Sequence, residues 1–485
     1  MYKLNPIMVG IAMALATTGC SLLNPSLNSA SEAAGVKNIQ SIEFSGTGRW
    51  YQFGQAPNPD LPWPPFDVKS FTANINYSAA SARVQISRLQ VVETGRNRPV
   101  PVEQKVDQYI SGTTAWNKAT SANASPANTA QPAAVEERVA EIWESPQGFL
   151  KAALVNHAVS EPVDNGTKIS FSLSDKYRFI GIINDDDQLV QVKTCIDNPV
   201  LGDTVIESQY SDYKDFGGLQ FPAHIVRSAG GFPILDLTVS AVKINPTVEI
   251  SIPTEVSNPP AVSVVVKPLA NGVYYLTGGT HHSVAIEQRD HVVIVEAPLN
   301  EERSQAVIAK VKEIIPNKPI KYLVNSHAHF DHSGGLRTYV DAGATIVTEQ
   351  ANQAYYQKVW AYPHKINPDR LSKSNKPAIF ESFTGKHTLS DGNRNIEIYS
   401  LAGNSHNDAF DFVYLPKEKI LIEADAYTPT AGPATTPAAI NPYSLNLYEN
   451  IRKFKLDVNQ IAGLHGRDVP FSDLLTTIGL QKAQN

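Results

Sequence analysis

Three histidines and one aspartate lie within six residues of the stretch NSHAHFDHSGG, which covers positions 325–335. His327 and His329 are two positions apart, so an extended backbone points both imidazoles to the same side. Asp331 and His332 follow a predicted turn and can face a second position. Because neutral imidazole and carboxylate are ligands that zinc-like ions prefer, this spacing predicts a metal site. A divalent cation held there would activate a bound water molecule.

A lone histidine in a folded protein is most often a structural residue, but this cluster is too dense for that explanation. The chain has only twelve histidines and places three of them here. Burying them without partners would cost free energy. If they were exposed, nothing would explain why the apolar run IKYLV, at 320–324, directly precedes them. The metal site is therefore the preferred interpretation.

Further candidate ligands follow predicted strands later in the chain. His406 lies in LAGNSHNDAF, Asp425 in KILIEADAY and His465 in IAGLHGRD. Each of these is a weak signal when taken alone. In layered α/β folds, functional groups gather where strands end in loops, and the first cluster also follows a strand. We therefore expect these three residues near the first cluster.

The order of these residues resembles the metallo-β-lactamase-fold hydrolase superfamily, whose signature is His-x-His-x-Asp-His. The resemblance covers residues 264–480 and implies an αββα sandwich, an α+β fold, in the C-terminal half. It implies seven metal ligands, which are His327, His329 and His406 for a first ion, Asp331, His332 and His465 for a second, and Asp425 as the bridge. It also implies two divalent cations as cofactors. We expect zinc, with iron or manganese as the alternatives.

The same resemblance implies hydrolysis by a hydroxide that bridges the two ions and attacks a carbonyl. Asp331 is then also a catalytic residue that returns a proton to the leaving group. Tyr427, two positions after Asp425, is a candidate donor to an oxyanion, and a purely structural Tyr427 is the alternative. Glu296, in VVIVEAP, stands where the superfamily has a carboxylate that orients a ligand loop.

Differences from other members of the superfamily reduce the number of substrate classes to consider. Zinc β-lactamases usually carry Cys or Ser where this chain has Asp425, whereas thioesterases and lactonases carry Asp. We therefore expect cleavage of an ester, lactone or related acyl bond in a small-molecule substrate. Two alternatives stay open. One is a zinc β-lactamase that cleaves an amide, and the other is a surface lipoprotein that binds lipid or polymer and uses its metal for structure.

Three residues are candidates for substrate binding. Trp360 and Tyr362 lie in an aromatic insertion, QAYYQKVWAYPHKINPDR, that can wall a pocket for an apolar or cyclic substrate. A helix that packs these aromatics on the fold is the alternative. His282, in TGGTHHSV, precedes a predicted strand and can overhang the site, although a histidine in such a loop is more often simply exposed.

The elements that must position these residues alternate between strands and helices after a Pro-rich linker at 251–263. Apolar runs predict a strand before each candidate ligand. The segment EERSQAVIAKVKEII predicts a helix from Glu301 to Ile315, with Asn300 as its N-cap. This alternation indicates a layered α/β domain over residues 264–485.

Residues 39–250 instead alternate apolar and polar positions, as in SARVQISRLQ, and predict an antiparallel β-rich domain. GIINDDDQLVQV predicts a hairpin with its turn at 184–187. The helical segment 134–154 is expected to break at Pro146. The pattern is loosely similar to the half-barrel fold of periplasmic lipoprotein carriers, in which a sheet folds over a helix around an apolar cavity. Such a domain could present substrate, cap the catalytic face or mediate dimerisation.

The first twenty residues, MYKLNPIMVGIAMALATTGC, combine one lysine with an apolar run that is too short to span a bilayer. They predict an export signal at 1–20. The ending TTGC resembles a bacterial lipobox, which makes Cys20 a candidate for lipidation; an ordinary signal with an incidental cysteine is the alternative. Residues 21–38 are expected to form a flexible tether. These features predict a location in the periplasm or, through a lipid anchor, at the outer membrane of a bacterium.

Length and composition set the outer limits. A chain of 485 residues is expected to form roughly two to three domains, and 42% hydrophobic residues are enough for globular cores. The net charge of −6 and the lack of a long basic run argue against nucleic acid as a partner. Contact with a membrane is expected only through the N-terminal anchor.

Overall fold

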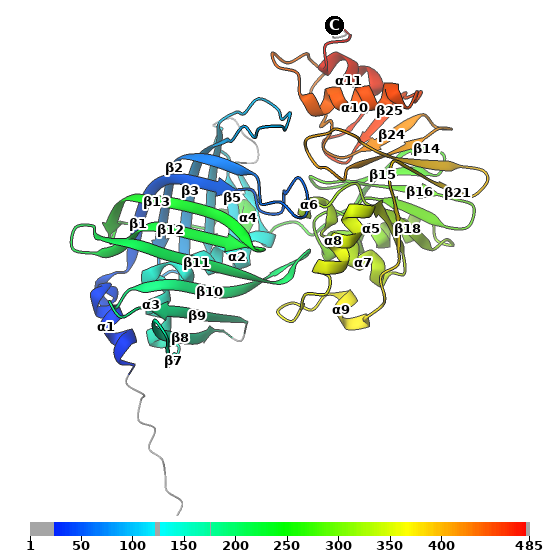
Figure 1. Cartoon of the computed structure of the whole chain (residues 1–485). Helices are drawn as coiled ribbons and strands as arrows, with labels where there is room; N and C mark the ends of the chain where they lie inside the picture. The colour runs from blue at the N-terminus through cyan, green and yellow to red at the C-terminus, as the bar shows by residue number, and fades with distance from the viewer. Residues whose placement is uncertain (1–23, 122–126, 175, 482–485) are drawn as a thin grey trace, which may run out of the picture.

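The computed structural model describes residues 24–121, 127–174 and 176–481, and it divides into a β-rich N-terminal lobe and a layered C-terminal lobe (Figure 1). The predicted export signal at 1–20 and the predicted lipidation of Cys20 lie outside these residues. Among the residues described, no helix is both long and apolar enough to cross a bilayer.

Thirteen antiparallel strands form a single sheet in the N-terminal lobe, which confirms the predicted β-rich domain. Burial alternates along most of these strands because successive side chains point to opposite faces. In chain order they are β1 (Ser41–Tyr51), β2 (Pro65–Asn76), β3 (Ser81–Gln90), β4 (Gln104–Ser111), β5 (Thr114–Lys118), β6 (Asn128–Ala130), β7 (Val159–Val163), β8 (Gly166–Leu173), β9 (Tyr177–Ile183), β10 (Leu189–Asn198), β11 (Gly202–Asp215), β12 (Gln220–Ala229) and β13 (Phe232–Ile244).

The spatial order of the strands is β6-β5-β4-β3-β2-β1-β13-β12-β11-β10-β9-β8-β7, so the first and last strands pair in the middle of the sheet. The chain between the edge strands β6 and β7 forms η2 (Pro132–Ala134), α2 (Val135–Glu144) and α3 (Pro146–Val155). Ile142 and Phe149 of these helices are fully buried in one core with the sheet. The helix break at Pro146 and the turn between β9 and β10 are as predicted.

The prediction of a flexible tether over 21–38 is wrong from Pro25 onward. These residues form α1 (Pro25–Ala33) and η1 (Val36–Asn38). Leu27, Ala30 and Val36 are buried in the core of the N-terminal lobe. The segment packs because its few apolar side chains share one side, which polar composition alone does not reveal.

The predicted linker at 251–263 contains one ordered turn, α4 (Thr254–Ser257). Val256 is buried, and Asn128 donates a hydrogen bond of 2.7 Å to Glu255. The turn therefore holds the start of the linker against β6.

Two mixed sheets face each other in the C-terminal lobe, and helices cover their outer faces, which confirms the expected αββα sandwich. The first sheet has seven strands, which are β14 (Val265–Ala270), β15 (Val273–Thr277), β16 (Ser283–Glu287), β17 (Val292–Val295), β18 (Ile320–Val324), β19 (Thr345–Glu349) and β20 (Phe380–Phe383). The second has six, which are β21 (Lys386–Ser390), β22 (Asn395–Ser400), β23 (Asp411–Leu415), β24 (Ile420–Glu423), β25 (Gln460–Gly463) and β26 (Asp468–Pro470).

The helices of this lobe are α5 (Glu301–Ile314), α6 (Phe330–Ser333), α7 (Leu336–Asp341), α8 (Gln350–Val359), α9 (Arg370–Ser374), α10 (Pro442–Lys453) and α11 (Phe471–Thr477). Figure 1 shows α5, α7 and α8 together beside the first sheet and α10 and α11 beside the second. The Asn300 side chain caps α5 as predicted, because it accepts a hydrogen bond from the Arg303 backbone N–H.

Strands in the middle of the sandwich are apolar on both faces. In β16, Val284 and Ile286 pack between the two sheets, while Ala285 faces the helices. β17 is the run VVIV and is buried throughout. A strand buried on both faces reads as a continuous apolar run, and it ends where polar groups must reach the surface.

Candidate metal centre

Each predicted metal ligand lies just beyond the end of a strand. His327 and His329 follow β18, and α6 then carries Asp331 and His332. The remaining three follow strands of the second sheet, with His406 after β22, Asp425 after β24 and His465 after β25. Because these strand ends meet at one edge of the sandwich, side chains from both sheets converge there.

Asp425 lies at the middle of the convergence. Its Oδ2 is 2.8 Å from His332 Nε2 and 3.5 Å from the Nε2 atoms of both His327 and His406. Its Oδ1 is 3.2 Å from His465 Nε2. One carboxylate thus contacts four imidazoles that come from three separate segments of the chain.

The imidazole nitrogens also approach one another. His332 Nε2 is 2.9 Å from His465 Nε2, and His406 Nε2 is 3.3 Å from His327 Nε2. Three groups have ligand atoms within 4.8 Å of one another. Two of them match the expected ion sites, which are His327, His329 and His406 in one and His281, Asp331, His332 and His465 in the other. The third joins Glu296 to His327 and His332. Paired imidazole nitrogens with a carboxylate between them are the donor set that divalent cations such as zinc prefer, so the residues fit two ions.

Glu296 orients the ligand loop through hydrogen bonds to its side chains. It follows β17, is fully buried and has a φ of 76°, a backbone conformation that non-glycine residues rarely adopt. Its carboxylate accepts hydrogen bonds from Asn325 Nδ2 at 2.9 Å, from Ser326 Oγ and from His332 Nδ1 at 3.1 Å. Because His332 Nδ1 carries the proton, its Nε2 is the nitrogen left to bind a cation.

His329 is oriented by the N-terminal lobe. Its Nε2 donates to the Ala56 carbonyl at 3.0 Å. Its Nδ1 is buried and has no hydrogen-bond partner within the described part of the chain. A buried ring nitrogen without a partner is costly, so Nδ1 is the atom that a cation would satisfy.

The pKa values of these groups suit cation binding. Burial lowers the pKa of His329 to about 3, and it lowers the pKa of His327 well below the ordinary value. Burial would raise the pKa of Asp425, but His332 and His406 outweigh that effect and hold it well below its usual range. Burial would lower the pKa of His332, but Asp425 and Asp331 outweigh that effect and raise it well above its ordinary value. Neutral His327 and His329 beside an ionised Asp425 are therefore the favoured protonation states.

The N-terminal lobe closes one side of the site. A cavity of about 400 Å³ lies over the cluster, and its walls include Gln52, Gln55 and Arg98. Gln55 Nε2 donates to Asp331 Oδ1 at 2.7 Å across 276 positions of sequence. The Phe330 backbone N–H donates to the Gly54 carbonyl at 3.1 Å. The loop between β1 and β2 thereby holds the turn that carries the ligands, and Figure 1 shows this loop reaching α6.

Three residues at the site were not assigned by sequence reasoning to the metal cluster or its support. His281 Nε2 is 3.0 Å from Asp331 Oδ2, and its ring centroid is 4.2 Å from that of His465. Gln55 and Arg98 carry no motif, and nothing in the sequence around them indicates a site. The neighbouring pair of histidines at 281–282 was a usable signal for His281.

The three predicted substrate-binding residues do not line this cavity. His282 is buried and bonds to the Gly466 carbonyl through Nε2 at 2.9 Å, so it holds the His465 loop. Trp360 stacks on Tyr356, as in the structural alternative. Tyr362 is 42% exposed and lines other hollows, one of which also includes Ala328 and Phe330 of the ligand turn. The predictions for His282 and Trp360 are wrong because packing holds both side chains away from the cavity over the cluster, whereas the prediction for Tyr362 stays a prediction.

Tyr427 also points away from the cluster. Its side chain is 4% exposed, and its hydroxyl is 3.3 Å from Thr477 Oγ1 of α11. The prediction that it donates to an oxyanion is therefore wrong, and the structural alternative holds. Asp331 does face the cavity, but its two oxygens are engaged by Gln55 and His281. Its proposed part in proton transfer stays a prediction.

A family model described as the metallo-beta-lactamase superfamily matches residues 276–443. Similar solved structures include a metallo-beta-lactamase from Pontibacter korlensis, with 18% identity, a TM-score of 0.35, and coverage of 46% of this chain and 100% of that one. The mono-zinc form of a metallo-beta-lactamase from Pseudomonas aeruginosa has 18% identity, a TM-score of 0.34, and coverage of 46% and 96%. Rubredoxin oxygen:oxidoreductase from Desulfovibrio gigas has 16% identity, a TM-score of 0.35, and coverage of 44% and 61%. The comparison with curated proteins found no match.

Proposed function

The C-terminal part of this chain belongs to the metallo-β-lactamase superfamily, and from that premise we propose that it is a metal-dependent hydrolase of an ester, lactone or related acyl bond. The position of Asp425 carries the proposal. Its two oxygens lie between 2.8 and 3.5 Å from four imidazoles that belong to both ligand groups. A carboxylate in that position suits a bridge between two cations.

Seven side chains would hold two ions, which are His327, His329 and His406 on one side, Asp331, His332 and His465 on the other, and Asp425 between them. Two bound divalent cations would lower the pKa of a shared water towards neutrality and polarise the substrate carbonyl. His281 stands beside the second group and is a further candidate ligand or neighbour.

The chain's own residues orient this centre and limit access to it. Glu296 sets the proton position on His332, and Ala56 does the same for His329. Gln55 holds Asp331 from the N-terminal lobe. Fixed orientation of ligands matters because a centre that must rearrange during the reaction loses rate.

The substrate class rests on the residue type at position 425. A bridging Asp, in place of the Cys or Ser of zinc β-lactamases, favours an acyl ester or lactone over a β-lactam. The cavity above the cluster has a volume of about 400 Å³, which suits a small molecule. Arg98 lines its wall, but its guanidinium is paired with Glu93 at 2.7 Å, so the wall gives no preference for an anionic substrate.

The test compares substrates on the purified chain loaded with zinc. We expect turnover of aryl esters or lactones and little turnover of nitrocefin. Nitrocefin turnover with inert esters and lactones would assign the β-lactamase alternative instead. Folding that is lost on metal removal, with no activity on any of these substrates, would favour a structural metal in a lipid- or polymer-binding protein.

A matched pair of variants ties activity to the bridge. Asp425→Asn keeps the size of the side chain but removes the charge between the two ligand groups. We expect it to lose most of the hydrolysis and at least one bound metal ion per chain, measured by elemental analysis. Asp457→Asn is the control, because Asp457 is exposed and its carboxylate pairs with Lys419 at the surface. Equal activity in the two variants would contradict the proposal.

A further inference from the structure

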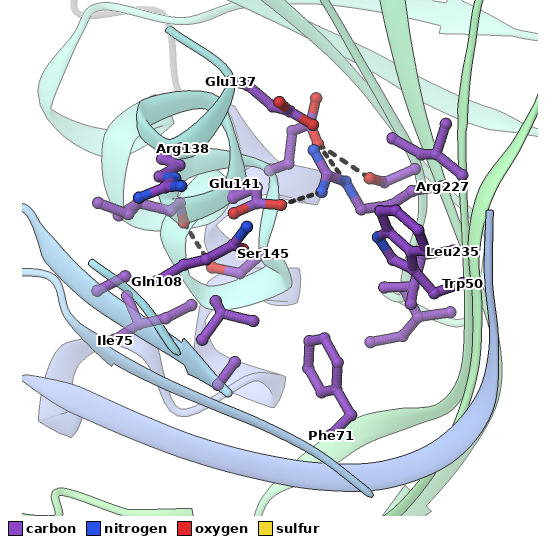
Figure 2. A pocket seen from close by; sticks show the side chains of 18 of the residues that line it. Trp50, Phe71, Ile75, Gln108, Glu137, Arg138, Glu141, Ser145, Arg227 and Leu235 are labelled. Atoms are coloured by element: carbon purple, nitrogen blue, oxygen red, sulfur yellow. Dashed lines mark hydrogen bonds and ion pairs between the residues drawn. The ribbon is translucent and has the colours of Figure 1, made fainter. Parts of the chain in front are cut away.

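A second cavity, of about 310 Å³, lies inside the N-terminal lobe between the thirteen-stranded sheet and helix α2. It shares no lining residue with the cavity over the candidate metal centre. Its volume lies at the lower end of the range of small-molecule pockets, about 300–1,000 Å³. Figure 2 shows its wall, with side chains from the sheet on one side and from α2 on the other.

Most of the wall is apolar. Phe71, Ile75, Ile86 and Leu235 are buried side chains of the sheet that face the cavity, and Ala73 leaves space between them. An empty apolar cavity of this size forfeits contacts on every side, whereas a hydrocarbon group would restore them. The wall therefore suits the apolar part of a ligand.

The other end of the cavity is charged. Glu137, Glu141 and Glu144 of α2 line this end together with Arg227 of β12. Figure 2 shows Glu137, Glu141 and Arg227 pointing toward one another, opposite Phe71. Arg227 donates to Glu141 through Nη1 at 2.5 Å and to Glu144 through Nε at 3.1 Å. Of the four charged side chains at this end, Glu137 and Glu141 are partly exposed, whereas Glu144 and Arg227 are buried.

Two buried atoms at the charged end lack partners among the residues that the structure describes. One is Glu144 Oε1, an acceptor, and the other is Arg227 Nη2, a donor. Both belong to side chains that are at least nine-tenths buried. Leaving such groups unpaired is costly, and a head group that donates to the first and accepts from the second would remove that cost.

We propose that this cavity binds a single-chain amphiphile with an uncharged hydroxyl-type head group. The hydrocarbon chain lies among the phenylalanine, isoleucine and leucine side chains of the sheet, and the hydroxyl lies between Glu144 and Arg227. A hydroxyl is both a donor and an acceptor, so one group satisfies both atoms.

The charge at this end of the cavity selects against an anionic head group. Three glutamates line it, and Arg227 is bonded to two of them, Glu141 and Glu144. Arg138 is committed to the carbonyls of Tyr109 and Trp116 and to Asn117. A carboxylate head would satisfy Arg227 but would face the unpaired oxygen of Glu144. Burial also raises the pKa of Glu144 to about 7, which indicates how poorly this place tolerates further negative charge.

The test uses dodecanol and dodecanoate, which share a chain and differ in head group, and neither contains a bond that an acyl hydrolase would cleave. Isothermal titration calorimetry on the full zinc-loaded chain is expected to show one dodecanol bound per chain. Dodecanoate is expected to bind at least about tenfold more weakly, because its charge lies beside a buried carboxylate. Dodecanoate binding as tightly as dodecanol, or no dodecanol binding, would overturn the proposal.

Variants locate the binding and its selectivity. Ala73→Phe and Ala82→Leu each fill the cavity and are expected to weaken dodecanol binding at least about tenfold, because each removes space for the chain. Ala241→Leu is the control, on an exposed position of the same sheet. Normal dodecanol binding by a folded Ala73→Phe or Ala82→Leu variant would also overturn the proposal, and circular dichroism checks the fold of each.

The head-group assignment has its own variant pair. Glu144→Gln removes the charge that opposes an anionic head, so the preference for dodecanol over dodecanoate is expected to fall. Glu161→Gln changes an exposed glutamate of β7, away from the cavity, and is expected to keep the wild-type preference. An unchanged preference in Glu144→Gln would contradict the assigned place of the head group.

Discussion

Substituting Gly54 by alanine tests how firmly the N-terminal lobe holds the candidate metal ligands. Gly54 has a φ of +79°, and its carbonyl accepts a hydrogen bond from the Phe330 backbone N–H. A Cβ at this position would lie 2.6 Å from both Cγ and Cδ2 of Phe330. Phe330 stands between His329 and Asp331, so any shift of its ring moves the ligand turn.

Two costs add in this variant. A left-handed backbone costs an alanine roughly 1–2 kcal/mol relative to glycine. The overlap with Phe330 adds about 1–3 kcal/mol, as for other overpacked sites. The ring cannot simply step aside, since it packs edge-on against Phe53 at 5.3 Å and against Trp63 at 5.8 Å between ring centroids.

Gly217→Ala is the matched control. Gly217 has a φ of +71° in the exposed turn between β11 and β12, and a Cβ there would meet nothing within 4 Å. It therefore carries the backbone cost without the overlap. The difference between the two variants isolates the contact with Phe330.

We expect Gly54→Ala to be less stable than Gly217→Ala by about 1–3 kcal/mol in denaturant unfolding. We also expect its zinc affinity, from competition with a chelator, to fall by roughly tenfold if about 1.4 kcal/mol of the strain reaches the ligand turn. Ester hydrolysis should fall with it, while Gly217→Ala keeps wild-type affinity. Equal zinc affinity and equal stability in the two variants would refute the reasoning.

Four further predictions concern single side chains and metal removal. Gln55→Leu removes the hydrogen bond that Asp331 receives from the N-terminal lobe. Zinc affinity should therefore fall by roughly tenfold, the magnitude expected for a hydrogen bond to a charged group. Titration with a competing chelator measures the affinity, and an unchanged value would contradict this role of Gln55. Chelation of the metal should abolish hydrolysis and zinc should restore it, whereas His281→Ala should retain less metal than wild type by elemental analysis; full retention would exclude His281 as a ligand. Burial raises the folded pKa of Glu144 from 4.5 to about 7, so the folded state binds more protons, and this group's contribution to stability is lost as pH rises through that window. Between pH 4.5 and about 7, the free energy of unfolding of the wild type should fall by about 3 kcal/mol through this group, and Glu144→Gln should lack that fall. Thermal unfolding across this pH range measures it, and the same pH dependence in both proteins would contradict the prediction.

The sequence alone determined the ligands that are close along the chain. His327, His329, Asp331 and His332 are held together by local backbone geometry, because a strand end and one helical turn already direct their side chains. The alternation of apolar strands with helices also indicated a layered α/β domain, and the resemblance carried by the motif implied the αββα class. These features depend on short-range spacing, which a sequence displays directly.

The sequence also placed His406, Asp425 and His465 after strands, but their spacing along the chain does not show that they converge. Their convergence comes from strand order, with β22, β24 and β25 in one sheet and β18 in the other. Only a resemblance to other chains supplied that order in advance.

Tertiary packing alone decided which side chains support the site. Gln55 reaches Asp331 across 276 positions, and no local pattern records a contact of that range. At 281–282, both residues are histidines, yet one imidazole faces Asp331 and the other bonds to the Gly466 carbonyl. The direction of a side chain depends on what fills the space around it, and that space is formed by chain segments that are distant in sequence.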